Sequence, residues 1–162
     1  MSISITKMLI LSFLIFLLLP KPVILAETNA TIAAEIKDDP VNPGSPYYVF
    51  KRIKETFTLN FLTFGEKNKA AYSEELLDTR LRELVHAVKN NNTGYLENVA
   101  NRYTNQAGII IEKYLNIDPN IKIQSQKNIS ILEYLRDNYP ANSPYWLMIQ
   151  YAVDTTKRIA GS

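Results

Sequence analysis

A run of apolar residues at helical spacing follows a double-proline turn, and it constrains the fold more than any other feature. The residues are Phe50, Ile53, Phe57, Phe61 and Phe64. Spacings of three and four place them on one face of a helix. Polar residues cover the other side: Lys51, Arg52, Lys54, Glu55 and Thr58. Upstream, Ser45 suits an N-cap and Pro46 the first helical position. We expect an amphipathic helix that buries this stripe against a neighbouring helix.

The rest of the chain also predicts helices, over residues 66–89, 95–115, 129–138 and 144–158. Inward-facing positions are expected at Leu77, Leu81, Leu84 and Val88 in the second helix, at Leu96, Val99, Tyr103, Ala107, Ile110 and Tyr114 in the third, and at Trp146, Ile149 and Val153 in the last. Residues 121–126 alternate apolar and polar and are predicted to be a connector. The fold class is therefore all-α, a small bundle of about four to five helices built on a long antiparallel helical hairpin.

The start of this hairpin resembles a known family. The resemblance rests on Pro43-Gly44-Ser45-Pro46 with Tyr48, Lys51-Arg52 with Glu55, Thr63-Phe64, Glu66-Lys67 with Lys69-Ala70, and Glu74, Glu75, Arg80 and Leu81. The family comprises bacterial secreted or membrane-anchored proteins that share a helical domain of unknown function, also found in the extracytoplasmic part of some anti-sigma factors. Gly65 stands where the family usually has Asp-Pro. The resemblance covers about residues 41–115, and it implies a fold and a location but no activity.

The N-terminal segment has the features of a secretory signal. Lys7 supplies a positive charge, and an apolar run from Met8 to Leu19 is too short for a comfortable membrane span. Cleavage is expected after Ala26, with Ala30 as the alternative and a retained anchor as the competing interpretation. The predicted organisation is a signal peptide at 1–26, a flexible lead at 27–42 and a helical domain at 43–162. The predicted location is secreted or extracytoplasmic, in the cell envelope.

The charge balance of the chain disfavours nucleic acid as a partner. The chain holds 18 Lys and Arg against 16 Asp and Glu, and two of the lysines lie in the predicted signal. The predicted mature chain is therefore neutral, and it lacks the basic excess that phosphate binding requires. Membrane contact is expected only through a retained signal.

The sequence contains no recognisable catalytic constellation. His86 is the only histidine and there is no cysteine, so a nucleophile–histidine pair would have to use a residue on a long helix. Glu74, Glu75 and Asp78 could in principle approach a divalent cation, but no further ligand completes the set at matching spacing, and a solvated face is expected. The sequence therefore predicts no enzyme, no cofactor and no metal.

Aromatic residues near the proline turns are the one candidate binding surface: Tyr47, Tyr48, Tyr139, Tyr145 and Trp146. Such rings could stack on sugar or peptide, although helix packing would also explain them. Two functions stay open. One is a non-catalytic module that binds a protein or a cell-envelope partner. The other is a small extracytoplasmic sensor or chaperone-like protein that binds metal or unfolded chains.

Overall fold

The structure is a computed structural model that describes residues 36–114, 116 and 119–161. This part of the chain forms helices and no strand: α3 (Tyr48–Phe57), the π-helical segment η1 (Thr58–Leu62), α4 (Glu66–Lys89), α5 (Thr93–Lys113), α6 (Asn120–Arg136) and α7 (Pro144–Ala160). The predicted all-α bundle is thereby confirmed. None of these helices has both the length and the apolar character that crossing a bilayer would take.

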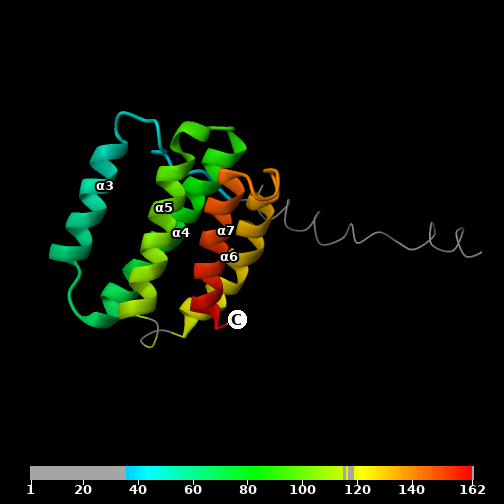
Figure 1. The fold of residues 1–162 in the computed structure, drawn as a ribbon. Coiled ribbons are helices and arrows are strands. Elements are labelled where there is room, and N and C mark those ends of the chain that lie inside the picture. Colours follow the sequence, from blue (N-terminus) through cyan, green and yellow to red (C-terminus); the bar gives the residue numbers. More distant parts are fainter. Residues whose placement is uncertain (1–35, 115, 117–118, 162) are drawn as a thin grey trace, which may run out of the picture.

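Helices α4 to α7 pack side by side into a bundle around one apolar core (Figure 1). The stripes predicted for α4 and α5 are buried from Leu77 to Leu84 and from Leu96 to Tyr114, whereas Val88 is only partly buried. The interior also holds polar contacts between helices. The buried Tyr103 hydroxyl lies 2.9 Å from the Thr156 hydroxyl, and Gln106 Nε2 donates a hydrogen bond to the Ser73 backbone carbonyl at 3.0 Å. Burying these stripes supplies the main stabilisation of the bundle.

Local signals fix several of the helix ends. Gly65 has a φ of 83° and leads directly into α4, which begins and ends where the sequence predicts. Ser143 caps α7, since its hydroxyl accepts a hydrogen bond from the Trp146 backbone N–H at 3.3 Å. The same motif at Ser45 works differently: its hydroxyl accepts from the Tyr47 N–H, and α3 begins only at Tyr48.

The predicted connector at residues 121–126 is wrong, because this segment is the first half of α6. Ile121, Ser125 and Asn128 are buried at spacings of four and three. The alternation of apolar and polar residues concealed this longer period. Because a helix gives these residues a buried stripe, packing decides the conformation.

The prediction that the apolar stripe from Phe50 to Phe64 is buried is also wrong. Its five residues are all exposed: Phe50 by 69%, Ile53 by 61%, Phe57 by 51%, Phe61 by 63% and Phe64 by 76%. Figure 1 shows α3 at one side of the bundle, separated in this view from α6 and α7. Helix α3 therefore meets the bundle through its other, polar face.

Candidate functional site

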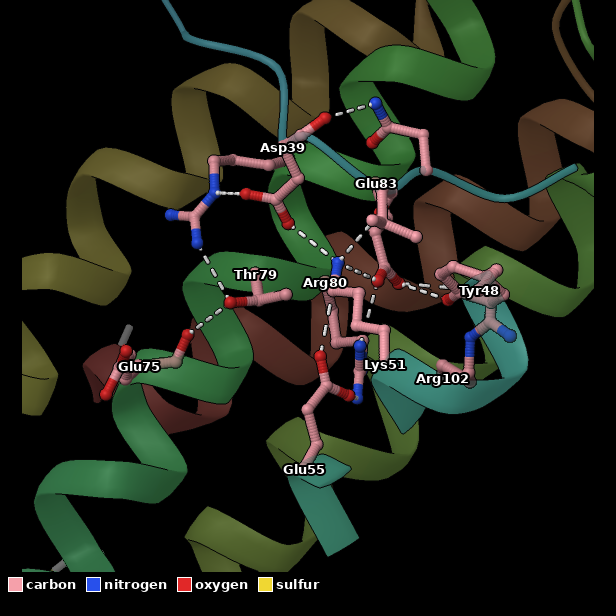
Figure 2. Close-up of polar contacts among 12 residues, drawn as sticks. Asp39, Tyr48, Lys51, Glu55, Glu75, Thr79, Arg80, Glu83 and Arg102 are labelled. Atoms are coloured by element: carbon pink, nitrogen blue, oxygen red, sulfur yellow. Dashed lines mark hydrogen bonds and ion pairs between the residues drawn. The ribbon is translucent and has the colours of Figure 1, made fainter. Parts of the chain in front are cut away.

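A buried carboxylate on α4 is the centre of the contact between α3 and the bundle. Glu83 is completely buried. Its Oε2 accepts a hydrogen bond from the Tyr48 hydroxyl at 2.7 Å, and its Oε1 accepts from Lys51 Nζ at 2.9 Å and from Arg80 Nη1 at 3.0 Å (Figure 2). Arg102 on α5 lies 3.9 Å from the same carboxylate. Three elements thus share one buried negative charge.

Two further carboxylates extend this cluster toward solvent. Glu55 pairs with Arg80, and Asp39 accepts from Lys51 Nζ and from Arg82 Nε, both at 2.8 Å. We call the whole set the polar seam: Asp39, Tyr48, Lys51, Glu55, Arg80, Arg82, Glu83 and Arg102. Each acid of the seam lies next to at least one base, and each base next to at least one acid, so every charge has a partner of opposite sign within the seam.

The pKa shifts in the polar seam follow from burial and from these partners. Burial alone would raise the pKa of Asp39, but hydrogen bonds from Lys51 and Arg82 outweigh it and hold the pKa below its ordinary value of 3.8. Burial, and then the neighbouring Glu83 carboxylate, raise the pKa of the Tyr48 hydroxyl. The hydroxyl therefore stays protonated at neutral pH and acts as a hydrogen-bond donor.

The seam reverses the usual orientation of an amphipathic helix. At about 100° per residue, Tyr48, Lys51 and Glu55 lie within roughly 60° of one another around α3. The apolar residues lie on the opposite side. We call the exposed apolar surface of α3, η1 and the following turn the apolar ridge: Val49, Phe50, Ile53, Phe57, Phe61, Leu62 and Phe64. Within it, Phe57 and Phe61 stack with their ring centroids 5.0 Å apart.

Grooves run along both sides of α3. The larger, about 660 Å³, has α5 as its far wall, and its lining includes Ile53, Phe57, Phe61, Tyr95 and Arg102. The other, about 500 Å³, has α4 as its far wall, and its lining includes Phe50, Lys54, Tyr72 and Leu76. Both grooves extend inward to residues of the polar seam, Tyr48 and Arg102 in the larger and Lys51 and Glu55 in the smaller. The ridge therefore projects from the bundle between them.

The structure does not gather the predicted aromatic surface in one place. Tyr139 and Tyr145 pack together near the α6–α7 turn, with ring centroids 5.4 Å apart, and the Arg136 guanidinium lies 5.3 Å from the Trp146 ring centroid. Tyr48 is buried in the polar seam, whereas Tyr47 is 68% exposed beside the smaller groove. In Figure 1 the start of α3 and the α6–α7 turn lie on opposite sides of the α4–α5 turn.

The acidic face of α4 does not bring together a ligand set. In the described part of the chain, no three residues of the types His, Cys, Asp or Glu lie where they could hold one metal ion. Glu75 is exposed and Asp78 partly buried, and burial raises the pKa of the Asp78 carboxyl. His86 is partly buried, and its Nδ1 lies 3.3 Å from the Asp38 carboxylate.

Sequence reasoning missed Glu83 and Asp39, the two acids that connect the elements. The end of the predicted flexible lead instead contacts the domain: Ile36 packs against the core and Asp39 bonds to α3 and α4. The predicted signal peptide, residues 1–26, lies outside the described residues.

The sequence does contain a clue to Glu83. This acid lies among the apolar residues Leu81, Leu84 and Val85, which is typical of a buried charge.

Together, the bundle and the polar seam define a class: a small helical domain that carries an outward-facing amphipathic helix. The chain belongs to the family described as a domain of unknown function (DUF5667), which matches residues 40–142. The match begins one residue after Asp39 and includes α3 to α6. No curated protein and no solved structure matches the chain. The predicted membership of a family of unknown function is thus confirmed, over a longer span than the resemblance indicated.

Proposed function

We propose that this chain is a non-catalytic binding module that acts outside the cytoplasm and engages a partner through the apolar ridge. The exposure of the ridge carries the proposal. Four phenylalanines are each more than half exposed, and side chains of this size expose on the order of several hundred Å² together. Contiguous apolar patches of that size on soluble domains mark interaction sites.

The sequence supports the location. The apolar run from Met8 to Leu19, preceded by Lys7, is typical of a secretory signal. The resemblance to bacterial secreted and membrane-anchored proteins, and to the extracytoplasmic part of some anti-sigma factors, favours the cell envelope as the place of action. A partner in the envelope would then meet the ridge directly.

The state of the polar groups supports a non-catalytic role. In the polar seam the acids Glu55 and Glu83 are already paired with Arg80, and the Tyr48 hydroxyl donates to a carboxylate. Groups bound to one another in this way hold an element in place and are poorly suited to attack a substrate.

A chaperone-like function is the second candidate, favoured by the larger groove. Apolar side chains of Val49, Ile53, Phe57 and Tyr95 line it along α3 and α5. An extended apolar segment of an unfolded chain could lie in such a groove. On this alternative the ridge would form one wall of a peptide site.

Site-specific photocross-linking in the producing cell tests the proposal. A benzophenone amino acid replaces Phe57 on the ridge or, as the matched control, Tyr151 on α7, which is 62% exposed. We expect several-fold more adduct from position 57, whether the adduct is a protein, a second copy or a lipid. Equal yields at the two positions would refute a binding role for the ridge. The location is tested by fusing, after residue 162, a reporter that is active only in the cytoplasm. Activity of this fusion would refute a site of action outside the cytoplasm.

A further inference from the structure

We infer that the partner of the apolar ridge is the surface of an anionic lipid bilayer, on which α3 and η1 lie as an interfacial helix. This inference rests on the proposed function, since it names the partner of the same ridge. It adds a route to the membrane that is independent of the predicted signal. Charge placement and the shape of the ridge carry it.

Cations border the ridge on both sides. Around α3, Arg52 lies roughly 110° from the centre of the apolar face in one direction and Lys54 roughly 90° in the other. Both side chains are exposed. Basic residues at the edges of an apolar helix face can extend toward phosphate headgroups while the face itself enters the acyl boundary. The one acid of α3, Glu55, is turned inward to Arg80.

The end of the ridge repeats this arrangement. Phe61, Leu62 and Phe64 are each more than 60% exposed, and Lys67 follows them in the first turn of α4, next to the acid Glu66. Residues 47–69 carry five bases and two acids, a net charge of +3. Because the predicted mature chain is neutral, the remainder carries −3. The basic charge is therefore concentrated where the exposed apolar residues are, and it complements an anionic surface.

The same charges disfavour a second copy as the occupant. Packing α3 against the α3 of another copy would bring two Arg52 and two Lys54 side chains together. Neither helix has an outward acid to pair with them, because Glu55 is held in the polar seam. Like charges placed together at an interface oppose association. A bilayer containing anionic lipid instead attracts both cations of each copy, Arg52 and Lys54.

The shape of the ridge also fits a bilayer. Grooves on both sides make α3 a projecting element, and the apolar side chains continue through η1 to Phe64. An interfacial helix buries its apolar face only about 5–10 Å into the headgroup and acyl boundary. A projecting ridge can reach that depth without the bundle entering the membrane.

Vesicle co-sedimentation with residues 27–162 tests the inference. This segment contains the whole described core and the polar seam. The vesicles consist of phosphatidylglycerol with phosphatidylcholine, or of phosphatidylcholine alone. Ile53→Ser with Phe57→Ser is the ridge variant. Leu147→Ser with Tyr151→Ser is its control, because these α7 residues have the same spacing and similar exposure, 51% and 62%. We expect the ridge variant to bind anionic vesicles about tenfold more weakly, and the control to bind like the parent chain.

A second pair of variants tests the charges. Arg52→Gln with Lys54→Gln should weaken binding to anionic vesicles about tenfold and leave binding to neutral vesicles unchanged. Lys122→Gln with Lys127→Gln, two exposed positions on α6, should change neither.

Absence of vesicle binding by the parent chain, or equal binding by the ridge variant, would overturn the inference. If a protein adduct nevertheless formed at position 57, the proposed function would stand with a different partner. Concentration-dependent dimers lost in the ridge variant would identify a second copy.

Discussion

The bundle of α4 to α7 and the outer helix α3 are held by opposite kinds of interaction. In the bundle, apolar stripes from several helices meet in one core. Its two buried charged residues in the described part of the chain, Arg80 and Glu83, lie where α4 meets α3. At α3, the polar residues Tyr48, Lys51 and Glu55 face the bundle, and the apolar residues face water. The same amphipathic pattern therefore gives two orientations, and the neighbouring helix decides between them. Because Arg80 and Glu83 of α4 form ion pairs with Glu55 and Lys51 of α3, the polar face of α3 packs against the bundle.

The largest effect is expected from a core substitution. Leu132 on α6 is completely buried, and Leu132→Ala leaves a cavity that should cost about 2–5 kcal/mol of unfolding free energy. Denaturant unfolding followed by circular dichroism measures this loss. Because the core is shared by α4 to α7, all four helices should unfold together at a lower denaturant concentration. Ile123→Ala, an exposed position on the same helix, is the matched control. A normal midpoint for Leu132→Ala would contradict the placement of the core.

The next effect should be confined to α3. Glu83→Gln removes the charge shared by Lys51 and Arg80 and leaves both cations underpaired, although each keeps a second acid, Asp39 or Glu55. Breaking a buried pair costs about 3–5 kcal/mol, and we expect the lower end because of these remaining partners. Hydrogen exchange should show faster exchange of α3 amides, with the amides of α6 and α7 still protected. Equal acceleration in every helix would show that the polar seam and the core are not separate.

This contrast explains which parts of the structure the sequence could predict. The sequence predicts the bounds of α4 and α7 closely, because a glycine or a Ser-Pro pair marks their starts and their stripes meet apolar neighbours. The spacing of the apolar residues also predicts helix α3, but periodicity alone identifies the two faces of a helix and does not say which face is buried. That choice depends on Glu83, which is 35 positions from Tyr48 in the chain. The same holds for Asp39, whose partners Lys51 and Arg82 lie far along the chain.

A smaller effect should depend on pH. Because the folded pKa of Asp39 lies below its ordinary value of 3.8, its ion pairs stabilise the folded state above that value. The stabilisation is lost as the pH falls below 3.8 and through the folded pKa. At pH 7, Asp39→Asn should lower stability by about 1 kcal/mol, as expected for partly exposed pairs. Thermal melts of parent and variant should converge on acidification. A difference that persists below the folded pKa would show that Asp39 acts through packing and not through its charge.

The smallest effect on stability should come from the apolar ridge, although its residues are as apolar as those of the core. Ile53→Ser with Phe57→Ser should change the free energy of unfolding by no more than about 0.5 kcal/mol, because exposed side chains lose little burial on unfolding. Denaturant unfolding of this pair, beside Leu147→Ser with Tyr151→Ser, measures the difference. A loss comparable to that of Leu132→Ala would mean that the ridge is buried in solution, by another part of the chain or by a second copy. An unchanged stability together with weakened vesicle binding would separate the two regions, since the core would serve folding and the ridge would serve binding alone.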